Sequence, residues 1–439
     1  MPISKSQNSA QLPTKPDIRK STTVFALSQV LRVVGAFVVS ALIARQMGAS
    51  GKGELALLQQ IPTILSIVLG FGLGGTHIYY VGIGKRSVHE ALNDTFLITL
   101  FSAIVGIPLS MLIASFLPAL NETPLHLTAL AAALVPLGIL TGQLGAIATG
   151  AGKPKVQAWA TSISLALNLS VVIVLYFLVK LTLFSVLVTA AATSGIGCVV
   201  ILAALQIGSF RPRQGFLSRT KSALAYTRKH YITEVATLLE MRIDVLFLGA
   251  LGTSAAVGVY SVGVSFAELL WILPQTIETP LLARFLKEDG ETSGAMAAMA
   301  TRLVVALEGI LLLGSLLLLK PILTFFFGPY FTEAVQIFWG LAAGVALNGI
   351  ASPAMSYLTA RGRQFPGVSV FSLVSNTLLC VALIPSLGAL GAALASTFSY
   401  TCASLYILRV FCKEAHLGWR DIALFSLDDL KRVLPSIKR

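Results

Sequence analysis

Long apolar runs, each about the length of a bilayer-spanning helix, dominate the 439-residue chain. Stretches such as 24–44, 96–117 and 303–319 contain at most one charged residue each. About 20 apolar residues cross a hydrocarbon core as a helix, and a helix satisfies its own backbone hydrogen bonds where lipid cannot. Only 12% of the residues are charged, against about 25% in soluble domains. Because the apolar residues come in blocks and do not alternate as in β-barrel strands, we predict an all-α polytopic membrane protein.

The apolar runs predict about twelve transmembrane helices, which would place both termini on one side of the membrane. The predicted spans are 22–44, 56–83, 91–117, 127–149, 156–179, 182–207, 230–251, 257–283, 301–319, 334–358, 366–387 and 389–411.

The distribution of basic residues orients these spans. With both termini cytoplasmic, Arg45, Lys52, Lys180 and Lys320 fall outside, and Arg32 and Arg242 fall within spans. Every other Lys and Arg of the 32 falls on the inner side, which is the bias that the positive-inside rule describes. The formal charge of +13 is therefore interpreted as a membrane-orientation signal, and nucleic acid is not expected as a partner.

The chain is predicted to contain two six-helix halves. The expected segments are a cytoplasmic tail (1–21), an N-terminal half (22–207), a basic cytoplasmic linker (208–229), a C-terminal half (230–411) and a basic cytoplasmic tail (412–439).

Three sequence features recur in the same order in both halves. The turn 47–53 (MGASGKG) is similar to 251–258 (LGTSAAVG), and the segment 149–153 (TGAGK) is similar to 359–363 (TARGR). The helix that follows carries Asn168 in one half and Asn376 in the other. An even number of helices per half predicts a parallel repeat about a pseudo-twofold axis along the membrane normal, with a transport site between the halves.

Three stretches resemble the polysaccharide-lipid flippases of the Wzx type. They are ALIARQMGASGKGELAL (41–57), RIDVLFLGALGTSAAVGVYSVGVSFAELL (242–270) and SLGALGAALASTFSY (386–400). The resemblance extends over about residues 22–411 and implies the MATE-like fold of the multidrug/oligosaccharidyl-lipid/polysaccharide flippase superfamily. It also implies transfer of an undecaprenyl-diphosphate-linked oligosaccharide from the inner to the outer leaflet of a bacterial inner membrane, for O-antigen, capsule or exopolysaccharide synthesis, in company with polysaccharide polymerase machinery.

Arg32 lies near the middle of the first predicted span and shares a helical face with Gln29. Charged groups at this depth usually face a cavity or pair with one another, and an arginine fork matches phosphate oxygens well. We consider a phosphate contact and a structural pairing with a carboxylate equally compatible with the sequence.

A polar stripe runs along the seventh span. Thr233, Thr237, Glu240 and Asp244 are spaced four, three and four residues apart, which puts them on one helical face. The stripe predicts a wet cavity in which Arg32 pairs with Glu240 or Asp244 until substrate phosphate competes. The carboxylates, together with Glu308 of the ninth span, are candidates for coupling to H⁺ or Na⁺. The alternative is a solvated face on a half-exposed helix.

Arg242 points away from that stripe and needs a partner elsewhere. Glu268, on the eighth span, lies at a similar depth measured from the outer turn, so we predict a structural Arg242–Glu268 ion pair. A break in the eighth span is expected near Pro274, Glu278 and Pro280, because proline removes a backbone donor.

Enzyme chemistry is not indicated. The chain has no GxxxxGK[ST], HExxH or GxSxG motif, so we expect no catalytic residues, metal or cofactor. Cys198, Cys380, Cys402 and Cys412 lack paired or metal-ligand spacing and are interpreted as packing residues. The second reading is a MATE-type cation-coupled drug antiporter, and a third is a membrane glycan polymerase or ligase, which the short predicted outer loops disfavour.

Overall fold

The computed structural model describes residues 18–205, 216–288 and 290–423, with side chains described over 33–205 and 231–423 apart from residues 273, 279, 283 and 289. These residues form helices joined by short turns and loops, with no strand among them. The α-helices are α1 (Ile18–Leu69), α2 (Leu73–Gly82), α3 (Val88–Ser115), α4 (Leu125–Ala132), α5 (Leu134–Gly150), α6 (Pro154–Leu178), α7 (Leu183–Leu205), α8 (Phe216–Leu251), α9 (Ser254–Ala267), α10 (Ile272–Phe285), α11 (Gly290–Phe327), α12 (Ala334–Ala360), α13 (Pro366–Leu387), α14 (Ala389–Glu414) and α15 (Trp419–Ala423). The short 3₁₀ helices are η1 (Pro118–Leu120), η2 (Glu268–Trp271) and η3 (Pro329–Phe331).

Ten helical segments in the described part of the chain are long and apolar enough to cross a membrane. The all-α, polytopic prediction is therefore confirmed, whereas the number twelve stays a prediction. The element α1 contains two of the expected spans. Gly48 (φ 69°, ψ −172°) interrupts the helical backbone between them. A positive φ costs glycine little and other residues more. The charged helix α8, which contains the seventh expected span, is not among the ten.

Two of the predicted spans are interrupted inside the helical bundle. The second one stops at Leu69 and restarts at α2, after Phe71 and Gly72 with φ values of 48° and 63°. The eighth one is interrupted by η2, ahead of Pro274, and α10 then continues through Pro280. The break expected around Pro274 and Pro280 thus lies earlier in the chain, at η2. Pro274 sits in the first turn of α10, where a proline is tolerated.

Other predicted boundaries shift as well. The fourth predicted span consists of two helices, α4 and α5, separated at Ala133. The predicted basic linker is helical from Phe216 onward, as the start of α8, and residues 206–215 lie outside the described residues. The C-terminal tail begins as the end of α14 and includes α15 before the described residues end at 423.

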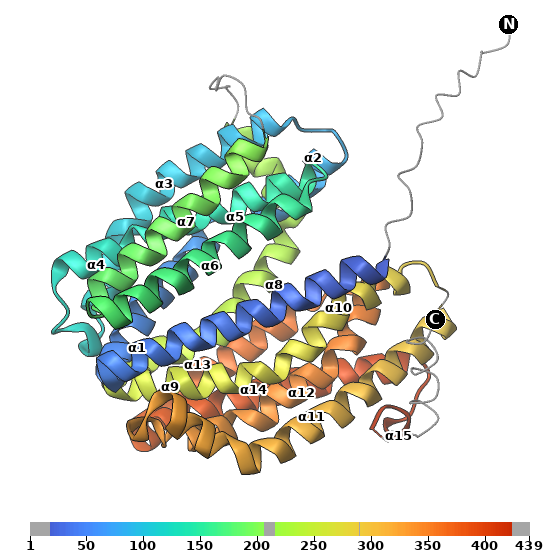
Figure 1. Cartoon of the computed structure of the whole chain (residues 1–439). Helices are drawn as coiled ribbons and strands as arrows, with labels where there is room; N and C mark the ends of the chain where they lie inside the picture. The colour runs from blue at the N-terminus through green and yellow to red at the C-terminus, as the bar shows by residue number, and fades with distance from the viewer. Residues whose placement is uncertain (1–17, 206–215, 289, 424–439) are drawn as a thin grey trace, which may run out of the picture.

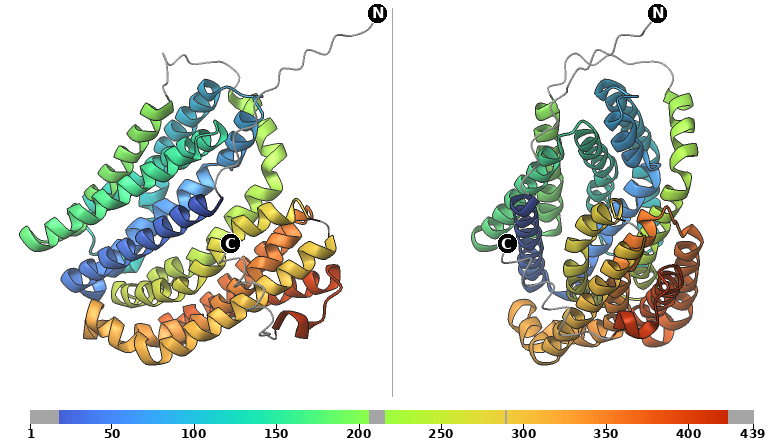
Figure 2. Two further views of the ribbon diagram at one scale, coloured as in Figure 1. Left: turned by 45° about the vertical axis from the view of Figure 1, so that its right-hand side comes forward. Right: turned by 90° about the vertical axis from the view of Figure 1, so that its right-hand side faces the viewer.

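The helices form two bundles, shown from three sides in Figures 1 and 2. In the N-terminal bundle (α1–α7), α5 packs against α2, α3 and α7, and α6 packs against α7 and α1. In the C-terminal bundle (α8–α14), α12 packs against α14 and α9, and α13 packs against α8 and α14. The connection between the bundles is dominated by α1, which packs against α9.

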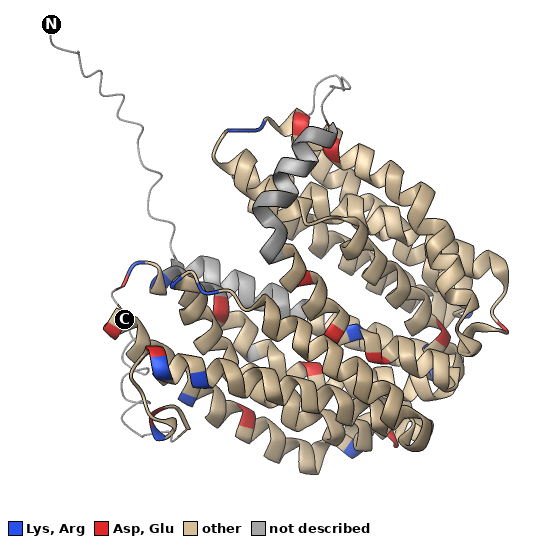
Figure 3. Ribbon diagram, turned by 180° about the vertical axis from the view of Figure 1, so that it is seen from behind, with Lys and Arg blue, Asp and Glu red and all other residues tan. Residues whose placement is uncertain are grey.

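The loops that carry most of the basic residues lie at the same end of the bundles. The connections after α2, α5, α10 and α12, and the end of α14, lie at the end where α1 begins (Figure 1). We call this the basic end, and the end that contains Gly48 and the α8–α9 turn the opposite end. Figure 3 shows further charged residues in the middle of the C-terminal bundle, away from both ends.

Candidate functional site

Asp244 of α8 is held inside the C-terminal bundle by neutral donors from three elements. Its side chain is 3% exposed. The Tyr260 hydroxyl of α9 donates to Asp244 Oδ2, and Ser396 Oγ of α14 donates to the same oxygen at 2.9 Å. The Val245 backbone N–H reaches Oδ1 at 2.7 Å. Among the described residues, the carboxylate is therefore engaged by neutral donors with no cation in direct contact.

Glu240 lies one helical turn before Asp244 on α8 and is also buried, at 6% exposure. The Ser372 hydroxyl of α13 donates to Glu240 Oε1. Asn376, one turn further along α13, donates from Nδ2 to the Glu240 carbonyl oxygen at 2.9 Å and lies 3.4 Å from Ser396 Oγ. The two carboxylates thus belong to one polar network that joins α8, α13 and α14.

A small cavity of about 150 Å³ lies beside this network. Its walls come from α8, η2, α10, α12 and α14 and include Thr237, Glu240, Trp271, Glu278 and Tyr400. Thr237 Oγ1 is 3.4 Å from Ser369 Oγ of α13. The polar stripe of the seventh span therefore borders a space inside the C-terminal bundle. The sequence predicts that Glu240 and Asp244 border a wet cavity between the two halves. In the structure, both lie inside the C-terminal bundle.

Glu308 of α11 lies against the wall of the same cavity. It is 2% exposed, and neither carboxylate oxygen has a hydrogen-bond partner among the described residues. A Cβ added to Gly349, a cavity-lining residue of α12, would lie 2.9 Å from Glu308 Oε1. Leaving a buried polar group unpaired costs about 1–3 kcal/mol, and more if the group is charged. Glu308 is thus suited to hold a proton or to meet a cation that enters the cavity.

Arg242 and Glu268 form an ion pair between α8 and η2. Arg242 Nη1 lies 2.9 Å from Glu268 Oε1, and both side chains are about 30% exposed. The structure therefore places the two predicted partners in contact. Their role in holding the helices together stays a prediction.

The side chains of Arg32 and Gln29 lie outside the described residues, although their backbone belongs to α1. The expected pairing of Arg32 with Glu240 or Asp244 is thus neither seen nor contradicted. Both carboxylates already accept hydrogen bonds from residues of their own bundle.

The two bundles touch at the opposite end through small residues. Ser50 Oγ lies 2.6 Å from Ser254 Oγ. A Cβ on Gly53 would overlap the Ser254 carbonyl oxygen, and one on Gly258 would overlap that of Ala49. Small residues at four-residue spacing let helices approach this closely in membranes. The two related turns predicted from the repeat are thus in direct contact.

Two further contacts reinforce this junction. The Arg45 guanidinium of α1 donates to the Phe325 and Phe326 carbonyl oxygens at the end of α11, with 2.8 Å from Nε to the latter. The Phe37 ring of α1 packs edge-on against Phe266 of α9 at 5.5 Å between centroids. The sequence places Arg45 only in an outer turn, and nothing in it signals that this arginine caps a helix of the other half.

Several residues of the carboxylate network were missed by sequence reasoning. They are Tyr260, Ser372 and Ser396, and Asn376 had been noted only as one half of a repeated pair. Their one available signal was a hydroxyl or amide inside an otherwise apolar span.

The comparisons with known proteins agree with this architecture. A family model described as "Polysaccharide biosynthesis protein" matches residues 18–286. A search of curated proteins found no match. The structure of the lipid II flippase MurJ in an inward closed conformation is similar with a TM-score of 0.72 at 14% identity, covering 90% of this chain and 90% of that chain.

Two structures of multidrug resistance MATE family transporters of the MOP superfamily are also similar. An inward-facing conformation gives a TM-score of 0.68 at 12% identity, covering 89% of this chain and 98% of that chain. An outward-facing conformation gives 0.58 at 12% identity, with 92% and 98% covered. The TM-scores establish the fold, and together with the family model they confirm the resemblance to the flippase superfamily. The chain therefore belongs to the polysaccharide biosynthesis protein family and is a multi-pass membrane protein with a MATE-like fold.

Proposed function

We propose that the protein moves an undecaprenyl-diphosphate-linked oligosaccharide from the inner to the outer leaflet of a bacterial inner membrane, by alternating access between the two bundles. The basic end would be cytoplasmic, with both termini on that side. The glycan would serve surface polysaccharide synthesis together with a polysaccharide polymerase.

The observation that carries this proposal is the junction between the bundles at the opposite end, in a member of a polysaccharide biosynthesis family. The bundles meet there through Ser50, Gly53, Ser254 and Gly258. In an alternating-access transporter, two pseudo-symmetric units separate at one side while they remain closed at the other. A junction in which small residues bring the two turns together supports such separation, because few bulky side chains meet between the turns themselves.

In this mechanism, the substrate diphosphate meets Arg32, with Gln29 on the same face of α1. An arginine fork matches phosphate oxygens in both charge and geometry. Thr237 is exposed on α8, whereas Glu240 and Asp244 are buried, so among these three it is the residue best placed to contact substrate. The burial of Glu240 and Asp244 favours coupling over direct contact with an anionic head group.

Coupling would reside in Glu240, Asp244 and Glu308. Binding of H⁺ or Na⁺ would change the hydrogen bonds that tie α8 to α13 and α14, since those bonds end on the carboxylates. Charged groups inside a membrane protein are costly unless shielded or paired, so neutralisation of these carboxylates would alter the packing of the C-terminal bundle.

Depletion of the protein in its native host tests the proposal. After depletion, cells with an intact inner membrane are treated with a membrane-impermeant oxidant such as periodate. Lipid-linked oligosaccharide is then extracted, and the oxidised share gives the fraction accessible from outside. We expect total lipid-linked oligosaccharide to rise and its outside-accessible fraction to fall, with wild-type expression restoring both. Unchanged glycan together with increased drug sensitivity would reject the flippase and favour the antiporter.

A further inference from the structure

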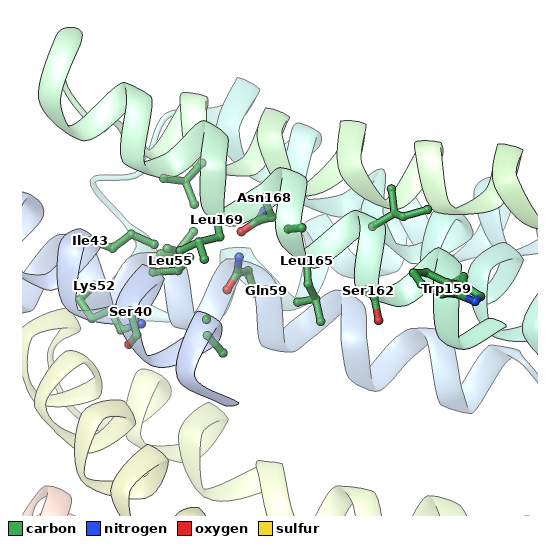
Figure 4. A pocket seen from close by; sticks show the side chains of 16 residues that line it. Ser40, Ile43, Lys52, Leu55, Gln59, Trp159, Ser162, Leu165, Asn168 and Leu169 are labelled. Carbon is green, nitrogen blue, oxygen red and sulfur yellow. The ribbon is translucent and has the colours of Figure 1, made fainter. Parts of the chain in front are cut away.

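A second cavity, of about 620 Å³, lies in the N-terminal bundle between α1 and α6. Figure 4 shows its lining side chains, with Lys52 and Ser40 toward one end and Trp159 at the other. Most of the remaining wall is apolar and includes Ile43, Leu55 and Leu165. Its volume lies within the range of about 300–1,000 Å³ that is typical of ligand sites. Neither the polar network nor the junction between the bundles uses it.

The cavity has one cationic side chain among its lining residues, Lys52. Lys52 makes no ion pair or hydrogen bond with the part of the chain that the structure describes. The nearest acidic residue in sequence, Glu54, is engaged elsewhere, by Ser50 Oγ at 3.4 Å and Thr123 Oγ1 at 3.2 Å. The hydroxyl oxygen of Ser40, also in the wall, is buried and has no hydrogen-bond partner among the described residues. The charged end of the cavity therefore has donors available for an anion.

The repeat shows how this cavity differs from its counterpart. Aligning the related turns at Gly48 and Gly252 puts Ala36 at the position of Glu240 and Ser40 at that of Asp244. Asn168, the repeat partner of Asn376, also lines the cavity. In the C-terminal bundle the two carboxylates fill this place and are tied to α13 and α14. In the N-terminal bundle the smaller, neutral residues leave space, and the charge at its edge is positive.

The shape of the cavity suits an extended apolar chain. Its wall follows α6 from Trp159 to Leu169, about 15 Å at the rise of an α-helix. The rim is exposed to the surroundings, with Trp159 67% and Ile163 36% exposed. In a membrane protein such exposed apolar residues face lipid chains, which gives a chain a lateral route into the cavity.

We propose that the cavity between α1 and α6 binds an anionic lipid, with one apolar chain lying along α6 and a phosphate head group at Lys52. A zwitterionic head would place its own cation beside the ammonium, and a free anion would leave the apolar wall uncovered. Charge and shape together thus favour a phosphate-bearing lipid over either.

Photolabelling of the full-length protein in detergent tests this proposal. The probe is a phosphatidate with a photoactivatable diazirine on one acyl chain, and labelled peptides are located by mass spectrometry. We expect labelling within 35–59 and 159–169. Unlabelled phosphatidate should compete about tenfold better than phosphatidylcholine, equivalent to roughly 1.4 kcal/mol, and millimolar inorganic phosphate should not compete.

Matched variants separate the two parts of the site. Lys52→Gln should abolish the preference for phosphatidate, while Lys320→Gln, another lysine of the opposite end, should keep it. Ala166→Phe, which fills the cavity, should reduce labelling several-fold, while Val174→Phe, an exposed position of α6 outside the lining, should not. Thermal unfolding checks that each variant is folded.

Three results would overturn the proposal. They are equal competition by phosphatidylcholine, an unchanged preference in Lys52→Gln, and displacement by inorganic phosphate alone. Since the assay measures binding and needs no transport, it is decided separately from the flippase proposal.

Discussion

The carboxylates of α8 are stabilised by hydroxyl and amide donors of neighbouring helices. Tyr260 and Ser396 serve Asp244, and Ser372 serves Glu240. Neutral donors tolerate both protonation states of a carboxyl, because a hydroxyl can either donate or accept. A cationic partner would instead fix the ionised form. Such a site can change its charge without losing all its bonds.

Replacing these carboxylates by amides tests their role. Asp244→Asn and Glu240→Gln keep side-chain shape but cannot bind a proton or balance a cation. We expect each to lower transport by about tenfold or more, corresponding to roughly 1.4 kcal/mol or more in the cycle, at unchanged membrane abundance. The measurement is the outside-accessible lipid-linked oligosaccharide in depleted cells that express each variant. Glu288→Gln, at a partly exposed position, is the control. Full activity of both amide variants would refute the coupling role.

Sequence reasoning placed some residues well and others poorly, for a physical reason. Helical periodicity and depth correctly paired Arg242 with Glu268. The depth of each residue can be counted along its own helix from the turn that joins the two helices. Periodicity also put Glu240 and Asp244 on one face, but it does not say which neighbour covers that face. The answer depends on Ser372 and Ser396, far away in sequence.

At the scale of helices, the Arg242–Glu268 ion pair joins α8 to the interruption between α9 and α10. The 3₁₀ segment η2 begins at Glu268 itself. We expect an ion pair at such a break to hold the two helices in position where the regular backbone pattern changes. Apolar run length predicted the long helices and the turn at Gly48. The break at Phe71 was not found, and the break at η2 was expected too far along the chain, since hydropathy continues through both.

Removing one partner of this pair should destabilise the protein more than removing both. Glu268→Gln leaves the Arg242 charge partly buried, and we expect a loss of about 1–3 kcal/mol, between the values for exposed and buried pairs. The double variant Arg242→Gln/Glu268→Gln should recover part of this loss. Thermal unfolding in detergent measures both. The exposed Arg284–Glu288 pair, at 3.8 Å, is the control, and strictly additive effects at Arg242 and Glu268 would contradict a coupled pair.

At the scale of the whole molecule, the bundles meet through the two related turns. Ser50 and Ser254 stand at matching positions of the repeat and face each other. Arg45 and Phe37 add contacts from α1 to the C-terminal bundle. The repeat found in the sequence predicted that the turns are related. Their direct contact could not be predicted, because it depends on how the two bundles are docked.

A reversible cross-link tests whether this junction opens during transport. The oxygen atoms of Ser50 and Ser254 are 2.6 Å apart, so Ser50→Cys/Ser254→Cys should form a disulfide with little backbone movement. We expect oxidation to abolish transport and a reductant to restore it, with cross-linking followed by mobility on gels. Each single cysteine variant is the control. Undiminished transport by the fully cross-linked protein would show that the junction does not need to separate.

The carboxylates and the lysine-edged cavity occupy matching places in opposite bundles, so an ion and a lipid held there would share no ligand. Neither would then displace the other from a shared site. Any influence of one on the other would have to pass through the movement of one bundle against the other.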